Sequence, residues 1–419
     1  MPNQKDLAVR IFPGLKKIFY AFFPVALISC LYLRVSQAAL TPLEIAGREA
    51  KATGAIPKKA WFEIFNESRD NFAKKYGTRF AFIFNYAQQV IVNSKHDEGK
   101  SRGLWYWNLE LSQALWQGAS LFAEFEVDKN KGIDKFLPTF SEFNTNTGKN
   151  ASLYLPELYM EQELFKDKIY MAAGKLDLSN WFDTNEVANS GDTQFLSDAL
   201  VGSENIPFPR KGIGALLRFA PSDWIYFALG SATAKSTATK VGLNKAFNSA
   251  FFVNEFGLSP KFASLQGNYR FIFYLNHQKL DLINDEEEGT KNNDFGFALS
   301  FDQAISKHIT LFMRYGFSDP KVREIEYFWS AGSQIIEPIA GRKFDCLGVA
   351  FAQSVMSDDY RTANEPDVGR AETMYEVYYS WRLNEAMTLT PNVQLAINPN
   401  ADKTAADEVV CGLRFLFCF

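Results

Sequence analysis

The chain has 419 residues and a formal net charge of −4, and aromatic residues make up 15% of it, including 39 Phe. An acidic chain is not a general binder of nucleic acid, because nucleic acids are bound by basic surfaces. After residue 38 no apolar run is long enough to cross a membrane as a helix. Beyond residue 38 the cysteines are Cys346, Cys411 and Cys418, and an odd number without tight spacing argues against a disulfide framework and a zinc site.

Residues 1–38 have the segment order of a secretory signal peptide. Lys16 and Lys17 precede the apolar run "IFYAFFPVALISCLYL", and small residues lie on both sides of a cleavage point before Ala39. We therefore predict that residues 1–38 are removed during export. The stretch "LISC" leaves open a second interpretation, lipidation of Cys30, but the apolar run continues beyond this cysteine.

Residues 39–76 differ from the rest of the chain because they lack an alternating pattern. Trp61, Phe62, Phe65 and Phe72 have a spacing compatible with a helix. We expect an N-terminal segment that is helical and either periplasmic or inserted into the lumen. A simple leader to the first strand is the alternative.

From residue 77 onward, apolar and polar residues alternate with a period of two. Trp105, Trp107 and Leu109, for example, alternate with Tyr106 and Asn108. This period is typical of a strand with one wet face. Sixteen such strands are predicted, at 79–92, 103–113, 119–127, 153–164, 168–177, 210–219, 223–232, 249–258, 267–277, 294–303, 308–317, 326–335, 342–354, 371–383, 387–396 and 408–419.

The connections after the even-numbered strands are short, such as "FKDK" at 165–168, whereas most of those after odd-numbered strands are long and polar. Such alternation gathers the short connections at one end of an up-and-down sheet. Together with an even strand count, it predicts an all-β fold, a transmembrane antiparallel β-barrel over residues 77–419 with short periplasmic turns and long outer loops. A soluble sandwich or propeller is the alternative, but it does not explain the loop lengths.

Charged residues lie on the strand face opposite the apolar one. A charge that faces hydrocarbon costs about 2–4 kcal/mol at the bilayer midplane, so we expect these side chains to face water inside the barrel. Both signs are present, which argues against a phosphate-selective pore. The set comprises Arg79, Lys175, Arg218, Arg270, Arg314, Arg382, Arg414, Glu110, Glu124, Glu126, Asp177, Glu255, Asp302 and Glu376.

The last nine residues, "CGLRFLFCF", place Phe415, Phe417 and Phe419 on one face of the closing strand. We expect this face to contact lipid. A terminal Phe on such a strand looks like the signal by which the barrel-assembly machinery recognises its clients.

Residues 77–419 resemble the carbohydrate-selective outer-membrane porins of the OprB type. The stretch 153–230 carries matches at Glu157, Gln194-Phe195-Leu196 and Pro207-Phe208-Pro209. Further matches follow in the same order, among them "YRFIFY", "FMRYGF", "GRKFDCLGVAF", "YEVYYSWRL" and "LTPNVQLAINP". The resemblance implies a sixteen-stranded porin that is narrowed by a long loop folded inward, with charged and aromatic side chains at the constriction.

We expect loop 178–209 to form this constriction. The predicted pore-lining residues are Lys175, Asp177, Trp181, Asp183, Glu186, Arg210, Arg218, Arg314, Glu376 and Arg382. Charged groups can replace the hydrogen bonds that a sugar loses with its water, while aromatic faces accept the apolar side of the ring. The alternative is that the loop residues only fold the loop.

The sequence thus predicts passive diffusion of small hydrophilic solutes, with carbohydrates preferred, through the outer membrane of a Gram-negative-type envelope. The expected partners are outer-membrane lipid, lipopolysaccharide, the barrel-assembly machinery and sugars, and the sequence leaves a homotrimer open. No cofactor or metal is expected. Two alternatives remain: a barrel for adhesion with little conductance, and a barrel enzyme, although His96, His277 and His308 lie on separate segments.

Overall fold

The computed structural model describes residues 61–95, 97–129, 131–146, 151–239, 249–284 and 289–419. The predicted signal peptide, Cys30 and the first part of the 39–76 segment lie outside the described residues. In the described part of the chain, no helix combines the length and the apolar character needed to cross a membrane.

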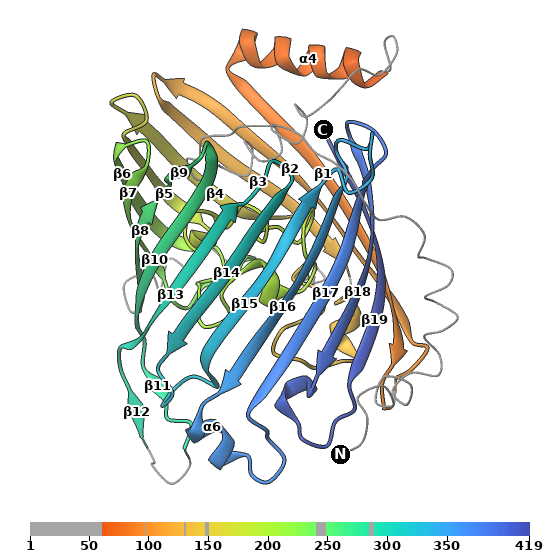
Figure 1. The fold of residues 1–419 in the computed structure, drawn as a ribbon. Coiled ribbons are helices and arrows are strands. Elements are labelled where there is room, and N and C mark those ends of the chain that lie inside the picture. Colours follow the sequence, from red (N-terminus) through yellow and green to blue (C-terminus); the bar gives the residue numbers. More distant parts are fainter. Residues whose placement is uncertain (1–60, 96, 130, 147–150, 240–248, 285–288) are drawn as a thin grey trace.

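Sixteen long antiparallel strands and the two-residue β9 form one sheet, which closes on itself where β1 pairs with β19. The long strands are β1 (Thr78–Asn93), β2 (Ser101–Trp116), β3 (Ala119–Lys129), β4 (Tyr154–Leu164), β5 (Ile169–Leu176), β6 (Gly212–Ser222), β7 (Ile225–Thr233), β8 (Ala250–Leu258), β10 (Leu265–His277), β13 (Asp294–Ala304), β14 (Ile309–Ser318), β15 (Ile325–Ile336), β16 (Cys346–Met356), β17 (Ala371–Arg382), β18 (Met387–Ile397) and β19 (Glu408–Cys418). The predicted barrel is therefore confirmed (Figure 1).

Short elements occupy some of the connections and the described start of the chain. They are α4 (Trp61–Tyr76), η1 (Ile133–Lys135), η2 (Leu178–Asn180), α5 (Asp198–Val201), β9 (Lys261–Phe262), β11 (Leu280–Asp281), β12 (Thr290–Lys291), α6 (Asp358–Ala363) and η4 (Pro399–Ala401). The short turns and the C-terminus gather at one end of the barrel, at the top of Figure 1, and α6 marks the long-loop end. The helix α4 lies outside the barrel at the short-turn end, where Phe72 contacts Phe80 with ring centroids 6.2 Å apart.

The alternation in sequence becomes an inner and an outer surface. On β10, Phe271 and Phe273 are 42% and 45% exposed, while Arg270, Ile272 and Tyr274 between and beside them are buried. Because side chains of a strand alternate between faces, the large exposed apolar residues form the outer surface. This surface suits lipid, and the polar residues are left to the interior.

The last residue takes part in closing the sheet. The backbone N–H of Phe82 donates to the carbonyl of Phe419 at 2.9 Å, and the N–H of Phe419 donates back to Phe82 at 3.1 Å. Across this seam the ring of Phe82 lies 6.4 Å from that of Phe417 and 5.6 Å from that of Phe419. The terminal aromatic residues therefore hold the first and last strands together.

One predicted strand begins too early. The prediction started at residue 342, but β16 begins at Cys346. Arg342 and Asp345 form an ion pair of 2.8 Å within a turn, and the backbone N–H of Asp345 donates to the Arg342 carbonyl. The local pairing favours a turn over a longer strand.

Candidate functional site

Loop 178–209, between β5 and β6, lies inside the barrel, where Figure 1 shows it in yellow-green behind the front strands. Three buried charged residues of the wall bind it, and we call them the loop anchors: Arg314 on β14, Glu376 on β17 and Arg414 on β19. Glu376 accepts hydrogen bonds from the backbone N–H groups of Leu196 and Ser197, at 2.8 and 2.9 Å.

The two basic anchors bind other parts of the same loop. Arg414 donates to the carbonyls of Gln194, at 2.8 Å, and of Gly191. Arg314 forms a 3.3 Å ion pair with Asp183 and donates to its carbonyl at 3.1 Å. These contacts reach across the barrel, so they fix the loop over the lumen rather than along one wall.

Asp183 also closes the loop on itself. Its carboxylate accepts from the backbone N–H and the hydroxyl of Ser203, at 2.6 and 3.0 Å. Its backbone has a φ of 57°, in the left-handed region that a non-glycine residue adopts at a cost. The ion pair with Arg314 offsets this strain and joins both ends of the loop to β14.

A second connection, the described segment 131–146 between β3 and β4, fills another part of the interior. Glu372 of β17 accepts from the N–H groups of Phe140 and Ser141, at 3.0 and 2.8 Å. The hydroxyl of Ser197 donates to the Ser141 carbonyl at 2.8 Å, which joins this segment to loop 178–209. The two connections together form a partition across the lumen.

On the other side of β1 from the Arg414 strand, β2, β3 and β4 carry a row of carboxylates. Glu110 pairs with Glu124 in the strand register, and Glu124 pairs with Glu157. All three are buried, and we call them the acidic row. Like charges directly opposite one another destabilise a sheet, so the row needs a compensating charge.

Lys211, just before β6, supplies part of this compensation. Its ammonium group lies 2.9 Å from Glu124, 3.8 Å from Glu157 and 3.9 Å from Glu126. Burial opposes the ammonium charge, but these carboxylates outweigh it and raise the pKa of Lys211 above its usual value. Lys211 therefore stays charged, with three carboxyl groups within 4 Å of its ammonium group.

The comparison with protein families decides the assignment. The model of the carbohydrate-selective porin, OprB family, matches residues 85–419. The chain belongs to this family. The resemblance seen in the sequence is thereby confirmed.

Individual relatives agree with the OprB assignment. A high-pH structure of OprB from Pseudomonas putida superposes with a TM-score of 0.75 at 16% identity, over 85% of this chain and 97% of that one. The chain is also 23% identical to "Porin AaxA" of Chlamydia abortus, over 66% of its own length and 59% of the relative's. It is 21% identical to "Porin B" of Pseudomonas aeruginosa, over 65% and 69%. It thus spans about three fifths of the length of the Chlamydia relative.

Membership of the OprB family places the chain in the outer membrane. The family and the fold indicate a channel rather than an enzyme. Family membership also implies contact with the outer membrane.

The structure places the predicted pore-lining residues in different settings. Asp183, Arg314 and Glu376 meet at loop 178–209, where they hold it. Trp181 is buried against Tyr159, with ring centroids 5.4 Å apart, and Asp177 accepts from the Ser179 N–H at the start of η2. These contacts fold and fix the loop.

Three other predicted residues remain accessible. Glu186 and Arg210 are exposed, one within loop 178–209 and one at its end. Arg218, on β6, is half-buried, with its guanidinium over the ring of Tyr226 at 4.3 Å. Arg382 lies apart at the short-turn end, where it donates to the carbonyls of Asn384 and Glu385, at 3.0 and 2.6 Å.

The prediction for Lys175 is wrong as to its face. In the β4–β5 register Lys175 lies opposite Leu158, which is 40% exposed on the outer surface. The Lys175 ammonium group is buried and donates to the carbonyls of Leu155 and Ala238. The segment that contains Ala238 covers this charge, which strand alternation alone did not reveal.

The expectation that the inner charges face water is also wrong for the loop anchors. Arg314, Glu376 and Arg414 lie on the inner side of the wall, but they are 0%, 1% and 2% exposed. Loop 178–209 covers them and replaces water as their hydrogen-bond partner. The alternating pattern predicted the strand face of these side chains, but it could not predict that a loop distant in sequence would bury them.

The sequence interpretation missed Lys211 and the acidic row as a unit. The sequence interpretation named Glu157 only as a match to the porin family. It selected Arg210 as a pore-lining residue and did not select Lys211. The signal that could have identified them is the register, since counting strand pairs aligns the three glutamates.

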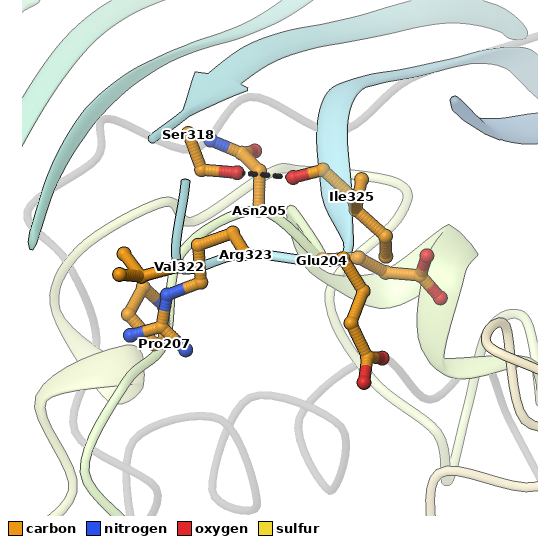
Figure 2. Close-up of a pocket in the computed structure, with 8 residues that line it drawn as sticks. Glu204, Asn205, Pro207, Ser318, Val322, Arg323 and Ile325 are labelled. Atoms are coloured by element: carbon orange, nitrogen blue, oxygen red, sulfur yellow. Dashed lines mark hydrogen bonds between the residues drawn. The ribbon is translucent and has the colours of Figure 1, made fainter. Parts of the chain in front are cut away.

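A cavity of about 350 Å³ opens at the long-loop end of the barrel (Figure 2). The returning part of loop 178–209 forms one side, and the β14–β15 turn with its flanking strand ends forms the other. The lining residues are Glu204, Asn205, Pro207, Ser318, Val322, Arg323, Glu324 and Ile325. Carboxylate, amide and guanidinium groups thus lie around a space of small-molecule size.

Proposed function

We propose that the chain is a porin for passive diffusion of small hydrophilic solutes, with a preference for carbohydrates. The observation that carries this proposal is the fixed loop: 178–209 lies across a closed barrel and is bound by three loop anchors. A rigid partition narrows a pore to a defined size. Family membership supports the choice of carbohydrates.

We infer that two groups of residues line the constriction. The first comprises the accessible charged residues Glu186, Arg210 and Arg218, and the second comprises Lys211 and Glu126 beside the acidic row. Charged donors and acceptors of both signs can replace the water of a neutral, hydroxyl-rich solute without holding it tightly. Of the other predicted lining residues, Asp183, Arg314 and Glu376 would act indirectly, by holding the loop.

The test is reconstitution of the purified protein in lipid. We expect steady single-channel conductance, and liposome swelling in glucose that is faster than in gluconate of similar size. Swelling at equal rates would contradict the carbohydrate preference. A barrel without conductance would contradict the porin function and favour the adhesion alternative. Segments 131–146 and 178–209, which both lie in the lumen, are compatible with that alternative.

We propose that the chain acts as a channel and not as an enzyme. His277 and His308 lie on different parts of the barrel, on β10 and in the turn before β14, and His96 lies outside the described residues. The test is an activity screen against lipid and ester substrates. Turnover that is lost on replacing a histidine would overturn the proposal.

Three partners follow from the surface. We propose that the barrel-assembly machinery recognises Phe415, Phe417 and Phe419 and that lipopolysaccharide contacts the outer apolar face. We also propose a homotrimer. A hydrogen-bonded polar group on the outer face of β1 and β2 supports it, since Tyr86 donates to Gln88 at 2.6 Å and Gln88 donates to Ser101 at 2.5 Å. Light scattering of the detergent complex would measure the copy number.

A further inference from the structure

The cavity at the long-loop end contains an acidic group without a counter-ion in the described structure. Oε2 of Glu204 accepts a hydrogen bond from the hydroxyl of Ser354 on β16. Oε1 is shielded from solvent and has no hydrogen-bond partner among the described residues. The nearby carboxylates of Glu372, Asp198 and Glu142 raise the pKa of Glu204 further.

The guanidinium group in the cavity wall does not neutralise Glu204. Arg323 donates through Nε to Asp294 at 2.8 Å, and its Nη2 binds the same carboxylate oxygen. Its charge is thus matched by the buried Asp294. Glu324 adds an exposed carboxylate to the lining. The cavity lining therefore holds two carboxyl groups that Arg323 does not pair, and a buried charge is stable only when it is paired or neutralised.

The Asn205 amide belongs to the wall of the cavity. Its Nδ2 donates to the carbonyls of Phe297 and Phe317, at 3.0 and 3.2 Å, and its Oδ1 is shielded from solvent beside Gly316. A volume of about 350 Å³ lies near the lower end of small-molecule sites, which favours a monosaccharide-sized ligand over a long oligosaccharide.

We propose that this cavity binds a monosaccharide-sized solute that carries a protonated amino group, with Glu204 as its counter-ion and the exposed carboxylate of Glu324 as a hydroxyl acceptor. Rotation about the terminal torsion of Glu204, which is broad for a carboxylate, presents Oε1 to the cavity. The site lies at the long-loop end, so it would enrich amino sugars before the constriction. This inference rests on the proposed porin function and refines its substrate class.

The experiment measures block of single-channel current by glucosamine, glucose and N-acetylglucosamine at neutral pH. We expect glucosamine to block the wild-type channel at about tenfold lower concentration than the two neutral sugars, because a charge-assisted hydrogen bond is the stronger kind. Glu204→Gln should remove this difference, and Glu204→Asp should retain most of it. Glu98→Gln, an exposed carboxylate on the β1–β2 loop outside the cavity lining, should leave it unchanged.

Equal block by all three sugars in the wild type, or a glucosamine preference that survives Glu204→Gln, would overturn the proposal. Heat-modifiable migration on gels reports whether each variant has a folded barrel. A wild-type protein that shows neither ion conductance nor liposome swelling in sugars would instead contradict the porin function. The two failures are therefore distinguishable.

Discussion

The loop anchors and the acidic row both place buried charge on the inner wall, yet the two regions use it differently. Each anchor bonds directly to loop 178–209. The acidic row sets like charges side by side, with Lys211 as the nearby cation. Charge that bonds to a loop fixes structure, whereas charge that is not matched by an opposite charge produces an electric field in the lumen. Inner position alone therefore does not identify a pore-lining residue.

The largest effect that separates the two regions should come from Arg314→Ala. Removing a fully buried arginine leaves Asp183 as an unpaired buried charge, which costs about 3–5 kcal/mol. We expect loop 178–209 to detach and the unitary conductance to rise at least about twofold, in proportion to the widened opening. Conductance and the temperature of barrel unfolding in detergent provide the measurements.

Arg314→Lys is the matched variant. It keeps the charge but loses the planar fork that reaches both the carboxylate and the carbonyl of Asp183, so we expect an intermediate effect. An unchanged conductance in both variants would mean that the anchor does not position the loop.

In the acidic row, Lys211→Gln should change selectivity more than stability. The substitution leaves Glu124, Glu126 and Glu157 without their cation, so the lumen becomes more negative. We expect the cation-to-anion permeability ratio to rise about twofold or more. The reversal potential in a KCl gradient measures this ratio.

Lys166→Gln, in the exposed turn after β4, removes the same charge away from the row. It should leave the reversal potential unchanged. Equal shifts in both variants would show that net charge, rather than the row, sets selectivity.

Glu204 combines both behaviours, because it bonds to the wall through Ser354 and also lacks a cation. Burial is the largest cause that raises the pKa of Glu204 well above its ordinary value of about 4.5, and the nearby carboxylates of Glu372, Asp198 and Glu142 add to it. Without a cation in the cavity, the folded state thus favours the neutral acid, whereas a bound ammonium group favours the carboxylate. Glu204 therefore stabilises the folded protein fully at pH values below its ordinary pKa in the unfolded chain. This stabilisation is lost as the pH rises through the raised pKa of the folded state.

We therefore expect amide exchange of residues 202–208, corrected for intrinsic rates, to increase as pH rises from about 5 upward. Glu204→Gln cannot ionise, so exchange in this variant should stay flat even though Asp198 nearby still titrates. The same pH dependence in the variant would assign the effect to another group.

Most of the fold follows from the sequence because a barrel is built on local alternation. Trp105, Trp107 and Leu109 predict their strand without reference to any other strand, and loop lengths predict the topology. The start of β16 was missed because the Arg342–Asp345 pair favours a turn that alternation does not report.

The site was less predictable because its contacts join residues far apart in the chain. The bond from Leu196 to Glu376 spans 180 positions, and the Arg314–Asp183 pair spans 131. Lys175 shows a second limit, since its burial depends on Ala238 in a different connection. Alternation gives the face of a residue in a regular strand, but cover and pairing depend on the whole fold.

Arg218 gives the smallest expected effect and the sharpest separation of the two regions, since it belongs to neither. It faces the lumen from β6 and contacts Tyr226 through its guanidinium group, a contact worth about 0.5–1 kcal/mol at an accessible site. Arg218→Ala should therefore leave barrel stability nearly unchanged and lower glucose swelling rates only slightly. Arg218→Lys keeps the charge and should swell like the wild type. A stability loss comparable to that of Arg314→Ala would show that Arg218 is a further anchor. In that case neither the solvent exposure of a side chain nor its location on the inner face would identify a pore-lining residue.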